Sequence, residues 1–179
     1  MNTKQCVSAL LLATSFTFAT AHAATYTDGE IMEIMKVANE AEIDAGDMAE
    51  DKAKNSEVKD FAKHMKEEHK KNKKEGKSVS KDAKIKMKSS AKSKELEKDA
   101  KNKLSGLKKM KDENFDKTYI TQQIEMHQAL LTELDSSLIP SAQDPKLKTF
   151  LEETKTHVQE HLTKAQEIQQ KMGPANQTM

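Results

Sequence analysis

Four side chains that can ligate a metal ion lie on the apolar stripes of four different predicted helices. These are Glu42, His69, His127 and His161. A carboxylate and imidazoles that converge in the core of a helical bundle suit Zn, Fe, Mn or Cu. The sequence therefore predicts a buried polar layer. This layer either binds one transition-metal ion or is held together by hydrogen bonds among its own members.

The short connection after the first long helix supports the pairing of Glu42 with His69. The number of residues from Glu42 to Asn55 is nearly the same as the number from Asn55 to His69. Because every residue of a helix adds the same rise, two antiparallel helices joined at Asn55 should hold these side chains at similar height. A carboxylate on a buried stripe also needs such a partner, since an isolated buried charge is costly.

The match in height is poorer between the last two long helices. Pro140 is expected to end the third long helix, and His161 lies about two helical turns further from it along the chain than His127 does. His157 fits the height better, because it lies one turn closer to Pro140 than His161, but it sits at the edge of the apolar stripe. We therefore keep His157 as a substitute for His161 in the predicted site.

Several enzyme patterns are missing or incomplete in this sequence. No Glu-x-x-His occurs, so the chain lacks the ligand pattern of di-iron carboxylate proteins. Residues 157–161 match the His-x-x-Glu-His pattern of inverted zinc peptidases, but the stretch after His161 is too short to supply their third ligand, and Glu160 is expected to face away from the core. No glycine-rich phosphate loop and no serine in a strand–turn–helix context occurs either. The sequence therefore predicts a protein without catalytic activity.

The elements that would position the site are all helical. Thr27 and Glu30 have the spacing of a capping box, and Asp144 followed by Pro145 is a typical helix start. The predicted long helices span about 28–54, 56–79, 114–138 and 145–172, and a peripheral helix spans 91–110. Two short connections with a long one between them are typical of ferritin-like folds. We expect an all-α, ferritin-like four-helix bundle with a long crossover carrying a short peripheral helix.

Three sequence motifs place the chain near a known family. They are Val58-x-x-Phe61-Ala62-x-x-Met65 with His69, Phe115-Asp116-x-x-Tyr119-Ile120 with His127, and His161-Leu162. In order and spacing the chain resembles the exported bacterial family of domain of unknown function 4142, over nearly all of residues 28–170. The resemblance implies a ferritin-like bundle outside the cytoplasm, and it implies no particular activity.

The N-terminal residues have the features of a secretory signal peptide over 1–23. Lys4 precedes an apolar run, and Ala21-His22-Ala23 fits the small-x-small cleavage pattern. Cleavage after Ala23 would remove Cys6, the one cysteine, and release a periplasmic or secreted protein. No later stretch is long and apolar enough to predict a transmembrane segment. We expect one bundle domain over 24–172 and a disordered tail over 173–179.

Positive charge is concentrated in the middle of the chain. Residues 52–111 contain 22 lysines against nine acidic residues, and the whole sequence has no arginine. Aromatic residues do not alternate with these lysines, so the segment offers no platform for stacking bases. Without the planar guanidinium, bidentate recognition of phosphates is also disfavoured. We predict a solvated helix face and crossover and no nucleic-acid partner.

Two hypotheses for the function follow from these features. The first is a binding module in envelope or stress physiology whose Glu/His layer takes one metal ion. The second is a periplasmic interaction or holdase protein without a ligand, which would hold an unfolded protein or an envelope partner. Most of the methionines are expected to fill the helical core, for which this residue is well suited. The alternative is an adaptable apolar surface for such a role, and Met32 fits it best because it lies furthest from the apolar stripe of the first helix. The sequence does not predict an oligomeric state.

Overall fold

The computed structural model describes residues 25–173, apart from the side chains of residues 112 and 113. The predicted signal peptide and residues 174–179 of the predicted tail lie outside this range. Within it every regular element is helical, which confirms the all-α prediction. The elements are α1 (Asp28–Lys52), α2 (Ser56–Asp82), α3 (Ala91–Lys109), α4 (Asp112–Glu133), the π-helical turn η1 (Leu134–Leu138), α5 (Ile139–Ser141) and α6 (Pro145–Met172).

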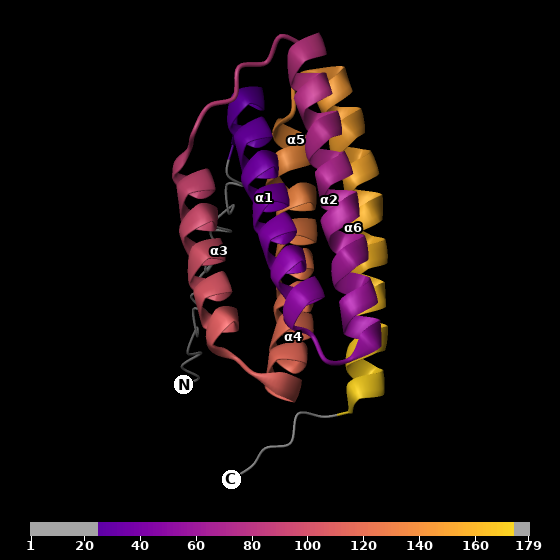
Figure 1. Ribbon diagram of the computed structural model, residues 1–179. Coiled ribbons are helices and arrows are strands. Elements are labelled where there is room, and N and C mark those ends of the chain that lie inside the picture. Colours follow the sequence, from indigo (N-terminus) through magenta and orange to yellow (C-terminus); the bar gives the residue numbers. More distant parts are fainter. Residues whose placement is uncertain (1–24, 174–179) are drawn as a thin grey trace, which may run out of the picture.

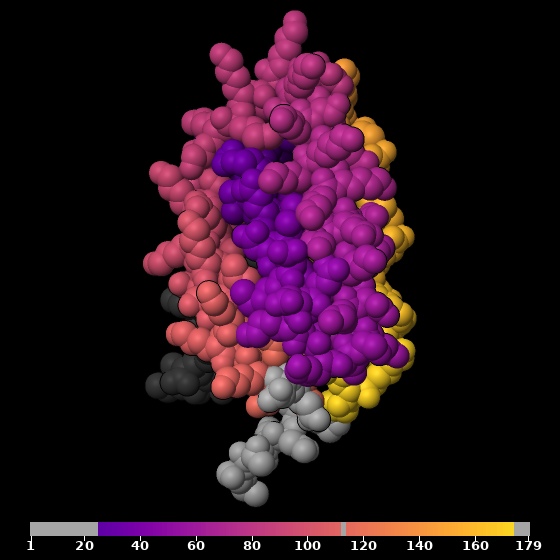
Figure 2. Space-filling view, in the orientation of Figure 1, coloured from indigo at the N-terminus to yellow at the C-terminus, as the bar shows by residue number. Residues whose placement is uncertain are grey.

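The four long helices α1, α2, α4 and α6 form the bundle, and α3 lies outside it. α1 packs along α2, α4 packs along α6, and α2 also contacts α6 (Figure 1). α3 runs beside α1 and reaches α4, to which a short connection joins it. In the space-filling view the outward face of α1 stays at the surface between α2 and α3 (Figure 2). The site is therefore surrounded by four long helices and flanked on one side by a fifth.

The helices begin where side chains can cap them. Thr27 and Glu30 form the predicted capping box at the start of α1. Asn55 accepts hydrogen bonds from two backbone N–H groups at the start of α2, and Asp144 does the same for α6. Each cap satisfies donors that the first turn of a helix leaves unpaired. These starts set the registers that bring the polar residues of different helices to one level.

A buried carboxylate ties the α1–α2 turn to α4. The Asp116 side chain is 2% exposed and accepts hydrogen bonds from the backbone N–H groups of Lys54, at 3.1 and 3.2 Å, and Asn55, at 2.7 Å. Both donors belong to the turn between the helices, where the helical ladder supplies no acceptor. Asp116 thus has a structural role at the base of the bundle.

The core consists of two apolar clusters with a polar layer between them. One cluster lies near the α1–α2 turn and includes Phe61, Met65, Phe115, Tyr119 and Ile168. The other lies at the opposite end and includes Ile31, Met35, Leu138, Phe150 and Leu151. Along each long helix, the buried polar residues other than Asp116 fall between the members of these two clusters. They are Asn39, Glu42, His69, Gln123, His127, Thr154 and His161.

Met32 lies in the core, as expected for most of the methionines, although it is the one furthest from the apolar stripe of the first helix. It is 1% exposed and belongs to the second apolar cluster. Gly76 on α2 makes room for it, because a Cβ there would lie 3.4 Å from Met32 Cε and 3.1 Å from Phe150 Cζ. A position at the edge of the stripe is buried here because a glycine on the neighbouring helix accepts the side chain.

The helical stretch that follows α4 ends at Ser141, one residue after the proline at which we expected the third long helix to end. After α4 the backbone forms a π-helical turn over η1, in which the N–H of Ile139 bonds to the carbonyl of Leu134. The chain then continues helically to Ser141. Proline has no N–H and its ring crowds the preceding turn, and a π-helical turn is one way to accommodate it. α2 likewise continues past the predicted end near 79 to Asp82, with Val79 packed against the core.

Candidate metal centre

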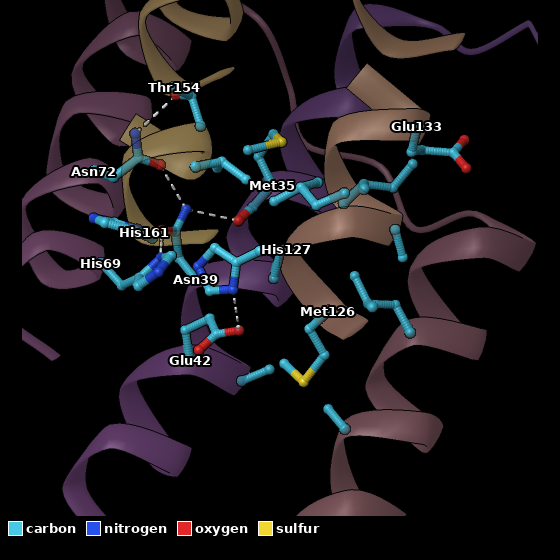
Figure 3. A pocket seen from close by; sticks show the side chains of 18 of the residues that line it. Met35, Asn39, Glu42, His69, Asn72, Met126, His127, Glu133, Thr154 and His161 are labelled. Carbon is cyan, nitrogen blue, oxygen red and sulfur yellow. Dashed lines mark hydrogen bonds and ion pairs between the residues drawn. The ribbon is translucent and has the colours of Figure 1, made fainter. Parts of the chain in front are cut away.

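Three histidines from three helices meet at the centre of the polar layer. His69 on α2, His127 on α4 and His161 on α6 each offer a nitrogen, and these nitrogens lie within 4.8 Å of one another. The ring centroids are separated by 5.9 Å, 5.4 Å and 5.5 Å (Figure 3). All three side chains are buried, with exposures of 2% to 6%. We refer to these residues as the histidine cluster.

Hydrogen bonds fix the tautomers of two of the imidazoles. The Nδ1 atom of His69 lies 3.0 Å from the side-chain oxygen of Asn39, and Nδ1 of His127 lies 2.8 Å from the backbone carbonyl of Gln123. Because both neighbours are acceptors, each Nδ1 carries a proton, and Nε2 is the nitrogen of each ring that is left for a metal ion. Hydrogen bonding of this kind is typical of histidines that ligate metals through Nε2.

The orientation of Asn39 is itself determined by further bonds. Its amide nitrogen donates to the backbone carbonyl of Met35 and to the side-chain oxygen of Asn72, both at 2.8 Å. Asn72 in turn donates to the hydroxyl of Thr154 at 2.8 Å. A chain of hydrogen bonds therefore runs from α1 through α2 to α6 and holds the His69 ring in place (Figure 3).

The nitrogens left over in the cluster have no hydrogen-bond partner among the described residues. They are Nε2 of His69, Nε2 of His127 and Nδ1 of His161. An unpaired buried polar atom costs about 1–3 kcal/mol, so three at one place are unusual. A metal ion coordinated by these nitrogens would give them a partner.

Burial also keeps two of these rings neutral. Desolvation, assisted by the neighbouring histidines, lowers the pKa of His69 well below its usual value. Desolvation and the proximity of His127, His64 and His157 lower the pKa of His161 to about 3. Neutral imidazole is the form that binds metals, so the lone pairs are available at physiological pH.

Glu42 lies beside the histidine cluster rather than within it. Its Oε2 accepts a hydrogen bond of 2.8 Å from the side-chain amide of Gln123, and its Oε1 lies 3.9 Å from Nδ1 of His127. Desolvation, and to a smaller extent the charge of Glu42, raises the pKa of Tyr119 well above the usual value. Of the four predicted ligands, the structure brings the three histidines together and places the carboxylate next to them.

His157 does not take the place of His161. It is at the surface, and its Nδ1 faces Glu160 at 3.7 Å. The predicted heights were misleading because both were counted from Pro140, although the helical stretch ends at Ser141 and α6 begins only at Pro145. Measured from the observed helix ends, the height of His127 falls midway between those of His157 and His161. The two candidates then fit the height equally well, and the inward orientation of His161 decides between them.

Several residues of the site were missed by the sequence analysis. Asn39 follows Met35 by one helical turn on the same buried face, which is a detectable signal, since a polar residue there must find partners. Asn72 and Thr154 give no comparable signal. His64 is exposed, yet its ring lies 5.8 Å from that of His161, which spacing along one helix could not reveal.

The fold and the site define a helical bundle with a histidine cluster buried at its centre. The chain belongs to the family described as Domain of unknown function (DUF4142), which matches residues 13–168. Among solved structures it is similar to CopM in the Cu(II)-bound form, with a TM-score of 0.63 and 19% sequence identity. That similarity covers 83% of this chain and 99% of the CopM chain, and it concerns the fold.

The remaining comparisons add two findings. No curated protein matches this chain. Among the helices of the described residues, none has the length and the apolar character needed to cross a membrane.

Proposed function

We propose that this protein is a non-catalytic module that binds one transition-metal ion through His69, His127 and His161. The observation that carries the proposal has two parts: each of three buried histidines offers a nitrogen within 4.8 Å of the others, and each of the three rings has a buried nitrogen without a hydrogen-bond partner among the described residues. Hydrogen bonds among the histidines themselves would satisfy these atoms if the layer were purely structural. Within the described residues they do not, and this favours the metal-binding hypothesis over a self-contained polar network.

Copper is the metal that this set of ligands favours, followed by zinc. Three neutral imidazoles suit both metals, and divalent copper binds nitrogen ligands most tightly in the first-row series. Iron and manganese, the other two candidates, usually take more carboxylates than the single Glu42 present here. The thioethers of Met35 and Met126 border the same cavity as the histidines and would suit Cu(I). The Cu(II)-bound state of CopM, a protein of similar fold, supports this choice.

We assign Glu42 to charge compensation rather than to ligation. Its carboxylate is held by Gln123, and a cation bound by neutral histidines would lie close to this negative charge. The attraction is strong in a buried setting, where the effective dielectric constant is low. Glu42 would therefore raise affinity for a cation while the histidines supply the ligand atoms.

The proposed place of action is the periplasm or the medium outside the cell. This rests on the predicted signal peptide with cleavage after Ala23 and on the resemblance to an exported family. A protein that takes up a metal ion there would buffer or store it, which fits a role in envelope or stress physiology.

The holdase hypothesis has less support. A protein that binds unfolded chains needs an accessible apolar surface. Among the described residues the exposed large hydrophobic side chains are Met87 and Met110, on the connections before and after α3. Most of the remaining methionines fill the core or pack at its edge, as is usual for this residue.

Metal loading tests the proposal directly. The mature protein would be treated with a chelator, reloaded with Cu(II) or Zn(II), and its metal content and binding isotherm measured. We expect about one ion per chain, and we expect the double variant His69→Ala/His127→Ala to lose it, because two of three ligands are removed.

The matched control is His157→Ala, which removes a histidine of the same helix as His161 that lies at the surface. It should load like the unmodified protein. Stoichiometric loading that survives in the double variant, or no loading in the unmodified chain, would show that the cluster is not the metal site.

A further inference from the structure

A cavity of about 370 Å³ adjoins the histidine cluster and extends beneath α3. Its walls come from α1, α2, α3, α4 and α6, and Figure 3 shows many of the side chains that line it. A volume of this size falls within the range of small-molecule sites and far exceeds what a metal ion needs. The cavity therefore calls for an explanation separate from the metal.

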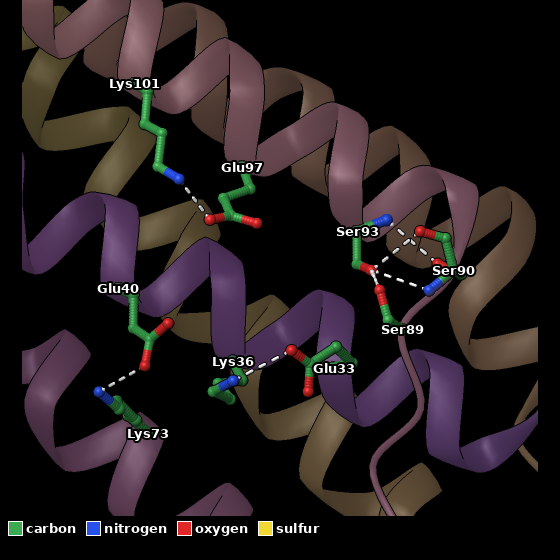
Figure 4. Close-up of polar contacts among 9 residues, drawn as sticks. All are labelled: Glu33, Lys36, Glu40, Lys73, Ser89, Ser90, Ser93, Glu97 and Lys101. Carbon is green, nitrogen blue, oxygen red and sulfur yellow. Dashed lines mark hydrogen bonds and ion pairs between the residues drawn. The ribbon is translucent and has the colours of Figure 1, made fainter.

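The hollow arises because α3 is anchored near its ends. Ser93 is buried and forms a capping box with Ser90 at the start of α3 (Figure 4), and Leu107 is fully buried near its end. Between these anchors Leu96 and Ala100 face the cavity and are only half-buried. The middle of α3 thus spans the hollow.

Small side chains on three helices keep the space open. Ala38 and Ala41 on α1, Ala100 on α3 and Ala129 on α4 all line the cavity. Larger apolar side chains at such facing positions would interdigitate and fill the space. The apolar residues that complete the wall include Ile34, Leu96, Leu130 and Val158. An apolar body is therefore the natural occupant.

Polar and charged groups in the wall determine which kind of ligand the cavity can bind. The nearly buried rings of His69 and His127 line it, and each has an unpartnered Nε2 that can accept a hydrogen bond. Carboxylates outnumber ammonium groups along the wall, seven to three. The carboxylates are Glu42, Glu68, Glu75, Glu95, Asp99, Glu125 and Glu133, and the ammonium groups are Lys71, Lys92 and Lys103.

Most of the lysine charge at the cavity is already neutralised. Lys92 pairs with Glu133 at 3.6 Å, and Lys103 pairs with Glu125 at 2.9 Å. By contrast, Glu68, Glu75 and Asp99 form no ion pair within the described part of the chain. Among the lysines of the wall, Lys71 alone also forms no ion pair there. The surplus is negative although the surrounding segment of the sequence is rich in lysine, so the cavity favours a cation.

We propose that this cavity binds a hydrophobic organic cation, with its apolar body in the hollow under α3 and its positive group at the unpaired carboxylates or the lone pairs of the histidines. The inference does not depend on the metal proposal, because size, apolar walls and charge carry it. A fatty acid or another organic anion fits the same volume but meets the wrong charge.

Binding of two fluorescent dyes by the mature, chelator-treated protein tests this inference. Aminoacridine is a flat aromatic cation, and anilinonaphthalene sulfonate is an anion with a comparable aromatic body. We expect the cation to bind at least about tenfold more tightly at low salt, and the preference to shrink as salt screens the carboxylates.

Variants locate the dye. Ala38→Leu fills the hollow and should weaken binding of the cation about tenfold or more. Ala45→Leu is the matched control, since it makes the same change two turns along α1 at a position that lines a smaller neighbouring cavity instead. If Ala38→Leu does not fold, Ala129→Leu serves, because that alanine lies at an exposed edge of the same cavity.

The charge is tested in the same assay. Asp99→Asn should weaken binding of the cation, while Glu97→Gln on the same helix, which pairs with Lys101, should not. Equal or tighter binding of the anionic dye, or unchanged binding in the cavity-filling variants, would overturn the inference. Either result leaves the metal-loading experiment unaffected, so the two proposals fail separately.

Discussion

Each buried imidazole uses its two nitrogens differently. In His69 and His127, Nδ1 is committed to an oxygen of the protein and Nε2 faces the other rings without a partner among the described residues. The oxygens that hold them come from an asparagine side chain and from the backbone one helical turn back. The rings are therefore oriented before any ion arrives, and binding would require little reorganisation.

The depressed pKa values make the metal-free protein sensitive to acid. His161 in the folded protein has a pKa of about 3, and that of His69 is also well below the usual 6.5, whereas both would take up protons at about 6.5 in the unfolded chain. Between these values the unfolded state binds more protons, so folded stability is present above about pH 6.5 and is lost as the pH falls towards 3. Each group contributes up to about 1.4 kcal/mol per pH unit over that window.

Thermal melting of the chelated protein between pH 7 and pH 4 measures this loss. His161→Leu should flatten the dependence, and the surface variant His157→Gln should not. A melting temperature that is the same at pH 7 and pH 4.5 would contradict the assigned shifts.

The groups that face His161 are His64 and His69 from α2, His127 from α4, His157 from its own helix, and Glu42 from α1 beyond His127.

At the scale of elements, the helices are joined by polar contacts at their ends. Asp116 on α4 holds the α1–α2 turn, and Asp28 at the start of α1 accepts hydrogen bonds from the backbone N–H groups of Gln143 and Asp144 before α6. The two carboxylates thus fix connections at opposite ends of the bundle. Since the polar layer draws residues from four helices, these contacts maintain its register.

Replacing Asp116 should destabilise the whole bundle. Asp116→Ala leaves two N–H groups of the part-buried turn without their acceptor, and we expect a loss of about 1–3 kcal/mol in the free energy of unfolding. Asp116→Asn keeps one acceptor oxygen and should lose less. Urea denaturation gives both values.

The control for this prediction is Asp135→Ala, which removes an exposed ion pair with Lys155. Such pairs contribute about 0–1 kcal/mol, so this variant should unfold close to the unmodified protein. If Asp116→Ala and Asp135→Ala were equally stable, the hydrogen bonds between Asp116 and the α1–α2 turn would contribute nothing measurable to the free energy of unfolding.

The sequence predicts the elements well because their signals are local. Caps such as Thr27 and Asp144 and the recurrence of apolar residues depend on neighbours within two helical turns. The burial of Met32 depends on Gly76 of another helix, and the hydrogen bond from Asn39 to Asn72 also joins two helices. Such features require the partner element to be known, which is why the ranking of His157 and His161 could not be settled from spacing.

Viewed as a whole, the molecule is a bundle in which a polar layer separates two apolar clusters. The layer interrupts the core near its middle, where desolvation of polar groups is most costly. The hydrogen bonds of Asn39, Gln123 and Thr154 offset part of this cost, and the unpartnered nitrogens leave the rest. If the proposed site binds an ion, the metal-free bundle should be less stable than the loaded one.

Metal binding should consequently stabilise the entire fold. The proposed ligands come from α2, α4 and α6, so an ion held by all three would bind only the folded chain. At a free-metal concentration of about 100 times the dissociation constant the gain is about 2.7 kcal/mol. For a domain of this length this corresponds to a rise in melting temperature of about 5–10 °C. Calorimetry with and without Cu(II) measures it.

His69→Ala is the appropriate comparison for that measurement. Its melting temperature should respond little to the metal, whereas His157→Ala should respond like the unmodified chain. An equal rise in all three proteins would indicate ions bound elsewhere on the surface.

The alanines that keep the hollow open under α3 also have a thermodynamic consequence. A leucine buried at Ala38 or Ala100 would add three carbon atoms to the core, and each buried methylene contributes about 0.8 kcal/mol. The sequence forgoes about 2 kcal/mol at each such position while retaining a fifth helix over an unfilled space. In a bundle this size, that is a sizeable fraction of the usual net stability. The hollow is thus a place where stability could be gained by filling it, and the sequence leaves it open.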